Sequence, residues 1–313
     1  MAQAYQLSGK RVWVAGHRGM VGGALVRRLQ AEGCDVLVAG RSDVDLRNRD
    51  QVAAWMRNHQ PHVVMLAAAK VGGILANSTY PVDFLLDNLL IETSVLEASH
   101  ASGVEKLVFL GSSCIYPKFA EQPITEDALL TGSLEPTNEW YAIAKIAGIK
   151  LAQAYRVQHG SDYISAMPTN LYGPGDNFDL QSSHVMPALM RKAHEAKIAG
   201  SESITIWGSG TPRREFLHVD DCADACVHLL KTYSDGQHVN VGSGEDLTIL
   251  ELAQLVCDVV GFEGTIKTDT SKPDGTPRKL MSADKIRGLG WSPSIALKDG
   301  IATTYAWFLE NHA

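Results

Sequence analysis

Residues 11 to 29 read Arg-Val-Trp-Val-Ala-Gly-His-Arg-Gly-Met-Val-Gly-Gly-Ala-Leu-Val-Arg-Arg-Leu. The apolar run at 11–16 predicts a short buried strand that stops at a glycine, and residues 24–29 continue as a helix. Between them Gly16, Gly19 and Gly22 follow the spacing G-x-x-G-x-x-G. In a dinucleotide-binding fold the first glycine makes the turn, the second admits the pyrophosphate and the third lets helix pack on strand. This stretch therefore predicts an α/β fold with a doubly wound parallel (Rossmann) sheet.

The pyrophosphate of such a cofactor lies on the helix N-terminus, where unpaired N–H groups and the helix dipole favour anions. We therefore expect cofactor contacts from Gly16, His17, Arg18, Gly19, Met20, Val21 and Gly22. The next strand, 34–39, ends at Gly40-Arg41. An acidic residue at this place binds the 2′-hydroxyl of NAD, whereas a basic residue accommodates the 2′-phosphate of NADP. Arg41, with Arg18 in the loop, favours NADP(H).

The following elements bring further candidates to the same edge of the sheet. We expect helices at 49–59 and 81–102 and strands at 63–66 and 106–110. Ala68 follows the first of these strands, and a small side chain there lets a nicotinamide ribose lie against the backbone. Ser112 follows the second strand, at the carboxyl end where ligands bind in open α/β sheets.

Tyr141 and Lys145 stand four residues apart in a run, 141–155, rich in good helix formers. On a helix they lie on one face, about one turn apart. Free tyrosine titrates near ~10, and a nearby ammonium favours the phenolate and lowers the phenol's pKa. Such a tyrosine can give a proton to a carbonyl oxygen while a hydride moves to the adjacent carbon. Ser112 would hydrogen-bond the same carbonyl, so the three residues together predict a reductase.

Composition excludes several other classes of protein. The formal net charge of −7 leaves no electrostatic footprint for nucleic acid or an anionic membrane surface. The five cysteines show no C-x-x-C spacing, which indicates a reduced, cytoplasmic chain without disulfides or a metal site. No apolar run approaches ~18 residues, so we expect no membrane span. A length of 313 residues suits one large domain or two modest ones.

The regular alternation of strand and helix ends in the loop 172–178. Beyond the first half we expect strands at 163–167, 204–207, 214–221 and 238–241, and helices at 185–199 and 247–260. The strand at 214–221 is expected to end in an aspartate helix cap and to return the chain to the first domain. We therefore expect a nucleotide-binding domain, 1–171 plus 214–244, and a smaller mixed substrate domain, 172–213 plus 245–313.

The combination of glycine loop, strand-tip serine and Tyr-x-x-x-Lys resembles the extended short-chain dehydrogenase/reductase family. More narrowly, the chain is similar to the GDP-4-keto-6-deoxymannose 3,5-epimerase/4-reductases over about residues 10 to 311. The stretches that carry this similarity are AGHRGMVG, AAAKVGGI, FLGSSCIYP, YAIAKIAGIKL, MPTNLYGP, WGSGTPRREFLHVDD and SKPDGTPRKL.

The resemblance implies the remaining site residues. It places Pro168, Thr169, Asn170 and Leu171 at the nicotinamide end of the cofactor, together with Lys145 and His184. It implies that the GDP moiety is held by Lys192, Trp207, Arg214, Asp274 and Arg278, with Lys272 as a further available cation. Cys114 and His184 match the family's epimerase pair. Cysteine and histidine titrate close enough to neutrality for acid–base work.

The implied reaction is a double epimerisation followed by reduction. The protons at C3 and C5 of the sugar are both α to the C4 ketone, so removing either gives an enolate that shares one oxyanion. Cys114 and His184 would move those protons. NADPH would then deliver hydride to C4 while Tyr141 supplies the proton.

Other functions remain possible for the same fold. They are a colitose-type synthase, a 4-epimerase that keeps its NAD, a sugar-nucleotide dehydratase, and an NADP-binding sensor without turnover. A homodimer is expected because the helices at about 83–101 and 140–156 pair into a four-helix bundle in the extended family. Ala144, Ala147 and Ala152 would allow close approach there, although the same residues could serve internal packing.

Overall fold

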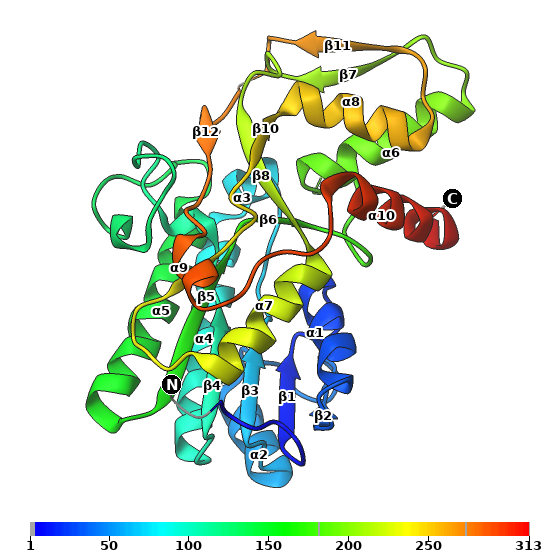
Figure 1. Cartoon of the computed structure of the whole chain (residues 1–313). Helices are drawn as coiled ribbons and strands as arrows, with labels where there is room; N and C mark the ends of the chain where they lie inside the picture. Colours follow the sequence, from blue (N-terminus) through cyan, green and yellow to red (C-terminus); the bar gives the residue numbers. More distant parts are fainter. Residues whose placement is uncertain (1–3, 181, 273, 313) are drawn as a thin grey trace.

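A computed structural model describes residues 4–180, 182–272 and 274–312. Its centre is a six-stranded parallel sheet of order β2–β1–β3–β4–β5–β9 (Figure 1). The strands are β1 (Arg11–Ala15), β2 (Asp35–Leu37), β3 (Val63–Leu66), β4 (Lys106–Leu110), β5 (Asp162–Pro168) and β9 (Val239–Val241). The predicted doubly wound sheet is confirmed. Strand order reverses between β1 and β3, the place where such sheets bind ligands.

Helices cover both faces of this sheet (Figure 1). One face carries α1 (Met20–Gln30) and α7 (Val219–Thr232), and the other α2 (Arg49–His59), α4 (Pro81–Ala101) and α5 (Glu139–His159). Side chains of β1 alternate between the two layers: Val12 and Val14 pack in the first, Trp13 and Ala15 in the second. All four are fully buried, as expected of a strand covered on both faces.

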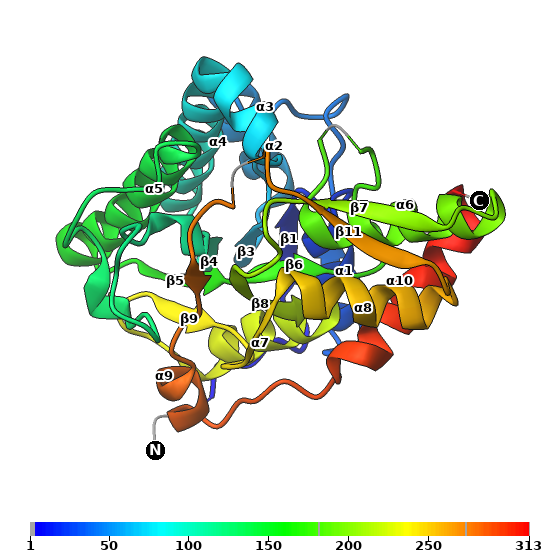
Figure 2. The same cartoon turned by 90° about the horizontal axis from the view of Figure 1, so that it is seen from above.

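The second region lies beyond the carboxyl ends of these strands (Figures 1 and 2). Its larger sheet contains β6 (Asn170–Tyr172), β8 (Arg213–His218), β10 (Asp246–Thr248) and β12 (Arg278–Lys279). A parallel pair of strands, β7 (Ser203–Trp207) and β11 (Thr265–Asp269), lies beside it. The helices α6 (Val185–Ile198), α8 (Ile249–Val260) and α10 (Leu297–His312) share a separate apolar core. Short helices α3 (Ile74–Thr79), α9 (Asp284–Gly288), η1 (Ser113–Ile115) and η2 (Glu126–Ala128) complete the described chain.

Two expectations for residues 214–221 need correction. The strand ends at His218, and it pairs with β6, β10 and β12, not with the central sheet. The cap of α7 is His218 rather than an aspartate: its side chain accepts a hydrogen bond from the backbone N–H of Asp220. The carboxylate of Asp221 is engaged elsewhere, because it accepts from Ser294 and from the backbone N–H of Ile295.

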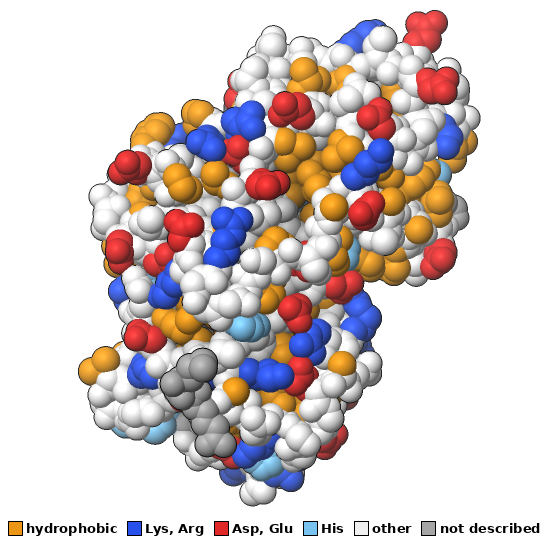
Figure 3. All heavy atoms as spheres, in the orientation of Figure 1, with side chains coloured by type: hydrophobic (Ala, Val, Ile, Leu, Met, Phe, Trp, Pro, Cys, Tyr) orange, Lys and Arg blue, Asp and Glu red, His pale blue; other side chains and the backbone are white. Residues whose placement is uncertain are grey.

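On the face drawn in Figure 3, basic and acidic side chains are interspersed. This agrees with the composition, which predicts no basic surface for nucleic acid. No helix in the described part of the chain is long and apolar enough to cross a membrane. Within the same ranges, no group of three or more His, Cys, Asp or Glu side chains could hold a metal ion.

Candidate active site

The glycine loop is built so that backbone approaches backbone. Gly16 has φ +98°, and a Cβ there would lie 2.6 Å from the backbone nitrogen of Ala68. A Cβ on Gly22 would lie 2.0 Å from the carbonyl oxygen of Gly16. Gly19 is the N-cap of α1, where no side chain caps the helix and no acidic residue lies in the first turn. The start of α1 therefore has neither a side-chain cap nor a nearby acid to compete with an anion, and these residues fit a dinucleotide pyrophosphate.

The tip of β2 carries two guanidinium groups. A Cβ on Gly40 would lie 2.7 Å from Nη2 of Arg18, so that guanidinium covers the end of the strand. Arg41 is largely exposed and lies 3.8 Å from Asp45. The one carboxylate directly at Gly40, that of Asp43, accepts the Gly40 N–H at 2.7 Å. Because this carboxylate is already used by the turn, the groups left to face a ribose are basic.

Lys145 lies inside the protein. Its side chain is 2% exposed, its Nζ is 3.0 Å from Oε1 of Glu92 on α4, and the Glu92 side chain is 1% exposed. The same Nζ lies 4.7 Å from the centre of the Phe109 ring and 5.9 Å from that of Tyr141. The ammonium therefore lies near the tyrosine ring, with a carboxylate as its nearest charge.

The electrostatics of Tyr141 differ from the sequence expectation. Burial raises the pKa of this phenol, and the electrostatic influence of the neighbouring Cys114 and Glu92 raises it further, whereas a hydrogen bond with Ser112 lowers it. The charge nearest to the Lys145 ammonium is the Glu92 carboxylate, 3.0 Å away. Among the protein's own charges, Tyr141 is a protonated phenol at neutral pH.

Ser112 and Cys114 are brought to the same place by η1. Ser112 caps this turn: its Oγ accepts from the backbone N–H of Cys114 at 3.3 Å. The sulfur of Cys114 accepts from Nδ2 of Asn138 at 3.3 Å and from Nζ of Lys279 at 3.7 Å. Because Asn138 is the N-cap of α5, three residues before Tyr141, this hydrogen bond holds the sulfur at the start of the tyrosine's helix. Ser112, Cys114, Tyr141 and Lys145 thus form one cluster.

Sequence reasoning assigned no role to three of the side chains found in this cluster. Asn138 stands just before the Tyr-x-x-x-Lys helix and Lys279 lies in the basic stretch 271–280, so proximity to named motifs was an available signal for both. Glu92 gave no signal, since it lies in a helix whose exposed faces also carry acids.

His184 lies at the start of α6, where its side chain makes no capping hydrogen bond. The preceding residues contact the loop after β3, because the backbone N–H of Gly73 donates to the carbonyl of Ser182 at 3.1 Å. The side chain is exposed, and partial desolvation by the surrounding protein lowers the pKa of its imidazole. No hydrogen bond among the described residues joins His184 to Cys114 or Tyr141.

Residues 168–171 connect the two regions. Pro168 ends β5, and the Thr169 N–H donates to the carbonyl of Val241 in β9. The Asn170 amide donates to the carbonyl of Glu215 at 2.8 Å. Leu171, in β6, packs against the core of the α1 and α7 layer. This segment is therefore held by both sheets at the carboxyl end of β5.

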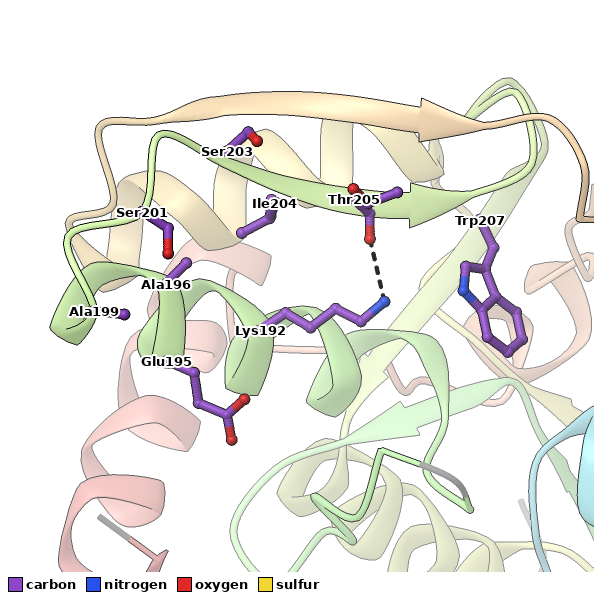
Figure 4. A pocket seen from close by; sticks show the side chains of 9 residues that line it. All are labelled: Lys192, Glu195, Ala196, Ala199, Ser201, Ser203, Ile204, Thr205 and Trp207. Atoms are coloured by element: carbon purple, nitrogen blue, oxygen red, sulfur yellow. Dashed lines mark hydrogen bonds between the residues drawn. The ribbon is translucent and has the colours of Figure 1, made fainter.

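The basic residues of the second region surround Trp207. Lys192 extends from α6 towards β7, where its Nζ donates to the carbonyl of Thr205 at 3.2 Å and lies 5.8 Å from the Trp207 ring centre (Figure 4). Lys272 approaches the same ring at 5.6 Å. The indole is 59% exposed and closes one end of a cavity of about 400 Å³. An exposed aromatic face flanked by two ammonium groups suits a base and its phosphates.

The other three predicted substrate residues differ in how they are engaged. Arg214 is half-buried, and burial lowers the pKa of its guanidinium. It has no carboxylate within 4 Å in the described part of the chain, so its charge is available. Asp274 accepts from the backbone N–H and the hydroxyl of Ser209, and Arg278 lies 2.5 Å from Asp246. Those two side chains already hold loops in place.

Known proteins resemble this chain over its whole length. The family described as the NAD dependent epimerase/dehydratase family matches residues 12–242. A GDP-L-fucose synthase of Sinorhizobium fredii is 62% identical over 309 residues, 99% of this chain and 98% of that protein. A GDP-L-colitose synthase of Yersinia pseudotuberculosis is 36% identical over 302 residues, 96% and 98% of the two chains. The crystal structure of a GDP-L-fucose synthetase from Naegleria fowleri bound to NADP is 30% identical, with a TM-score of 0.91 over 100% of this chain and 98% of that one. The chain belongs to the NAD dependent epimerase/dehydratase family.

Proposed function

We propose that this protein is a bifunctional 3,5-epimerase/4-reductase that converts GDP-4-keto-6-deoxy-D-mannose to GDP-L-fucose with NADPH. The observation that carries the proposal is Cys114 beside Ser112 and Tyr141. A thiol that transfers protons, next to a tyrosine that donates a proton during reduction, would allow epimerisation and reduction at the same C4 ketone. The relatives named GDP-L-fucose synthase and the neighbour with bound NADP support the substrate and the cofactor.

The epimerase half of the reaction uses the acidity next to a ketone. Removal of the C3 or C5 proton leaves charge on the C4 oxygen, where the hydroxyls of Tyr141 and Ser112 donate hydrogen bonds. Cys114 takes or returns a proton on one face of the sugar and His184 on the other. A histidine whose pKa is lowered is neutral at pH 7, and a neutral imidazole is ready to accept a proton.

The reductase half ends at Tyr141. NADPH, when bound, supplies a hydride to C4. Tyr141 gives its phenolic proton to the C4 oxygen, so the ketone gains one hydride and one proton and becomes an alcohol. Lys145 orients the phenol and holds the nicotinamide ribose, while Pro168, Thr169, Asn170, Leu171 and His184 close that end of the cofactor. Arg18 and Arg41 hold the 2′-phosphate.

The GDP moiety is proposed to lie across the second region. Arg214, Lys192 and Lys272 supply positive charge to the diphosphate, and Trp207 stacks on the base or ribose. Asp274 and Arg278 act at the rim, through the loops that they hold. The division of the chain into 1–171 plus 214–244 and 172–213 plus 245–313 belongs to this proposal, as does a cytoplasmic location.

We also propose a homodimer through α4 and α5. Of the three alanines expected to form the interface, Ala144 and Ala152 are fully buried within the chain and therefore pack internally. The exposed apolar residues of these two helices include instead Val82, Leu86, Leu90, Trp140, Ile143 and Val157. The first three repeat every four residues on α4 and so share one face. A second copy of this chain would cover that stripe. Light scattering at micromolar concentration should show a dimer, and Leu86→Asp should give a monomer, whereas Ile198→Asp on α6 should not.

One assay tests the main proposal. NADPH absorbance is followed while GDP-4-keto-6-deoxymannose is added, and the product sugar is then identified. We expect stoichiometric oxidation and GDP-L-fucose. A 4-epimerase that returns its hydride would consume no NADPH, and an NADP-binding sensor would bind it without oxidation. Faster turnover of a 3,6-dideoxy ketosugar would favour the colitose-type reaction that the Yersinia relative suggests.

A further inference from the structure

Glu92 is a buried carboxylate that the proposed mechanism does not use. It lies on α4, is 1% exposed, and its Oε1 is 3.0 Å from Nζ of Lys145 on α5. Neither carboxylate oxygen accepts a well-directed hydrogen bond from any described residue. The contact with Lys145 is therefore an ion pair by distance, and it is the carboxylate's only ion pair in the described chain.

The other carboxylates of α4 behave differently. They pair with cations of neighbouring segments at the surface: Asp83 with Lys70, Asp87 with Arg47, and Glu97 with Arg49. All three carboxylates are partly exposed, so water screens their charges and each ion pair contributes little. Glu92 alone points between α4 and α5, at the lysine next to the reacting tyrosine.

The opposing helix leaves room for this carboxylate. A Cβ on Gly148 would lie 2.7 Å from Oε2 of Glu92 and 2.4 Å from Cζ of Phe109. Glycine inside a helix costs about 1 kcal/mol relative to alanine. A buried ion pair is also no efficient way to stabilise a fold, because desolvation offsets much of the attraction. Packing alone therefore gives little reason for a glutamate here.

The chemistry of Tyr141 supplies a reason. Reduction requires the phenol, which donates a proton, whereas an ammonium beside a tyrosine favours the phenolate. We propose, on the basis of the proposed reductase function, that Glu92 is a positioning residue that holds Lys145 and offsets its charge so that Tyr141 stays protonated. The lysine can then orient the phenol and the ribose without ionising the proton donor.

The groups facing Tyr141 are consistent with this role. Lys145 lies one turn away on α5, and Cys114 and Ser112 approach from the end of β4. Lys279 and Asn138 both donate to the sulfur of Cys114. After burial and Cys114, Glu92 is the next cause that raises the pKa of the phenol. Burial raises the pKa of Glu92 itself, whereas the Lys145 ammonium 3.0 Å away lowers it and so favours the carboxylate that the proposed role requires. Removing that negative charge should lower the pKa of Tyr141.

The experiment compares pH profiles of kcat/KM for NADPH oxidation with GDP-4-keto-6-deoxymannose. In Glu92→Gln the rate at low pH should match the wild type, and the fall at high pH should begin about one pH unit lower. Glu97→Gln, which removes the same charge from the same helix, should leave the profile unchanged. A structural role would instead lower the rate of Glu92→Gln at every pH.

A second variant guards against misfolding. Glu92→Asp keeps the charge but withdraws it from Lys145, so its high-pH limb should shift in the same direction by less. If Glu92→Gln folds and the high-pH limb of its kcat/KM profile is unshifted, the proposed role of Glu92 is wrong. If Glu92→Gln does not fold, an unshifted high-pH limb in Glu92→Asp has the same meaning. A wild-type protein that fails to oxidise NADPH overturns the proposed function instead, so the two failures are distinguishable.

Discussion

The reacting groups and the substrate-holding groups of this protein differ in how far water reaches them. Around Tyr141 the charges are enclosed, with Lys145 and Glu92 2% and 1% exposed and paired with each other. Around Trp207 the site is open: the indole is 59% exposed, and the ammonium groups of Lys192 and Lys272 lie 5.8 and 5.6 Å from its ring centre. An enclosed charge acts strongly on its neighbours, whereas an open one is screened. Changes at the first site should therefore alter turnover, and changes at the second should alter binding.

The largest effect is expected from Tyr141→Phe. Loss of a positioned general acid should lower kcat for NADPH oxidation by roughly 10³-fold. Fluorescence titration should show NADPH affinity close to that of the wild type, because the phenyl ring still packs. Turnover within a few-fold of the wild type would contradict the assignment of Tyr141 as proton donor.

Cys114→Ala tests whether epimerisation and reduction use separate groups in the enclosed site. Solvent deuterium incorporation at C3 and C5 should fall by roughly 100-fold, the contribution typical of one acid–base group. NADPH binding should change little. Lys279→Met offers a matched probe, since it removes a donor 3.7 Å from the sulfur and leaves the thiol in place. If deuterium incorporation at C3 and C5 is unchanged in Cys114→Ala, the thiol has only a packing role.

The enclosed site also shows which features could be predicted from sequence. Helix 49–59 and strands 63–66 and 106–110 match their predicted bounds because local periodicity and flanking polar residues determine them. Glycine spacing alone predicted the turn at Gly16, where φ is +98°, but not the close approach of its backbone to Ala68. Glu92 and Lys279 could not be placed in this way. Their partners are on other elements, 165 residues distant for Lys279 and Cys114, and nothing local distinguishes a paired charge from a solvated one.

The open site is tested by Arg214→Ala. This guanidinium has no carboxylate partner among the described residues, and hydrogen bonds to charged groups contribute about 2 kcal/mol. The KM for the GDP-sugar should therefore rise roughly 30-fold with kcat less affected. Arg278→Ala is the control, because that side chain is paired with Asp246. If Arg214→Ala lowers kcat more than it raises KM, the distinction between a turnover site at Tyr141 and a binding site at Trp207 is wrong.

Cofactor preference should respond more weakly. Arg18 covers Gly40 at the tip of β2, whereas Arg41 is exposed and shares its charge with Asp45. We expect Arg18→Ala to raise the KM for NADPH about tenfold and Arg41→Ala to raise it less. The KM for NADH, which lacks the 2′-phosphate, serves as the control in both variants. Equal losses with both cofactors would remove the 2′-phosphate interpretation.

The smallest expected effect is on stability, and it tests whether the two halves of the chain unfold independently. Each has a helix capped by one side chain: Asn48 accepts from two N–H groups of α2, and Thr248 forms a capping box with Glu251 on α8. Replacing either cap by alanine should cost about 1 kcal/mol, or roughly 2 °C in Tm. Both caps lie outside the proposed site, so kcat should not change. If β8 and residues 168–171 couple the halves, calorimetry will show one transition that both variants shift equally. Two transitions, with Thr248→Ala shifting only one, would mean that the open half can unfold while the reacting groups stay enclosed.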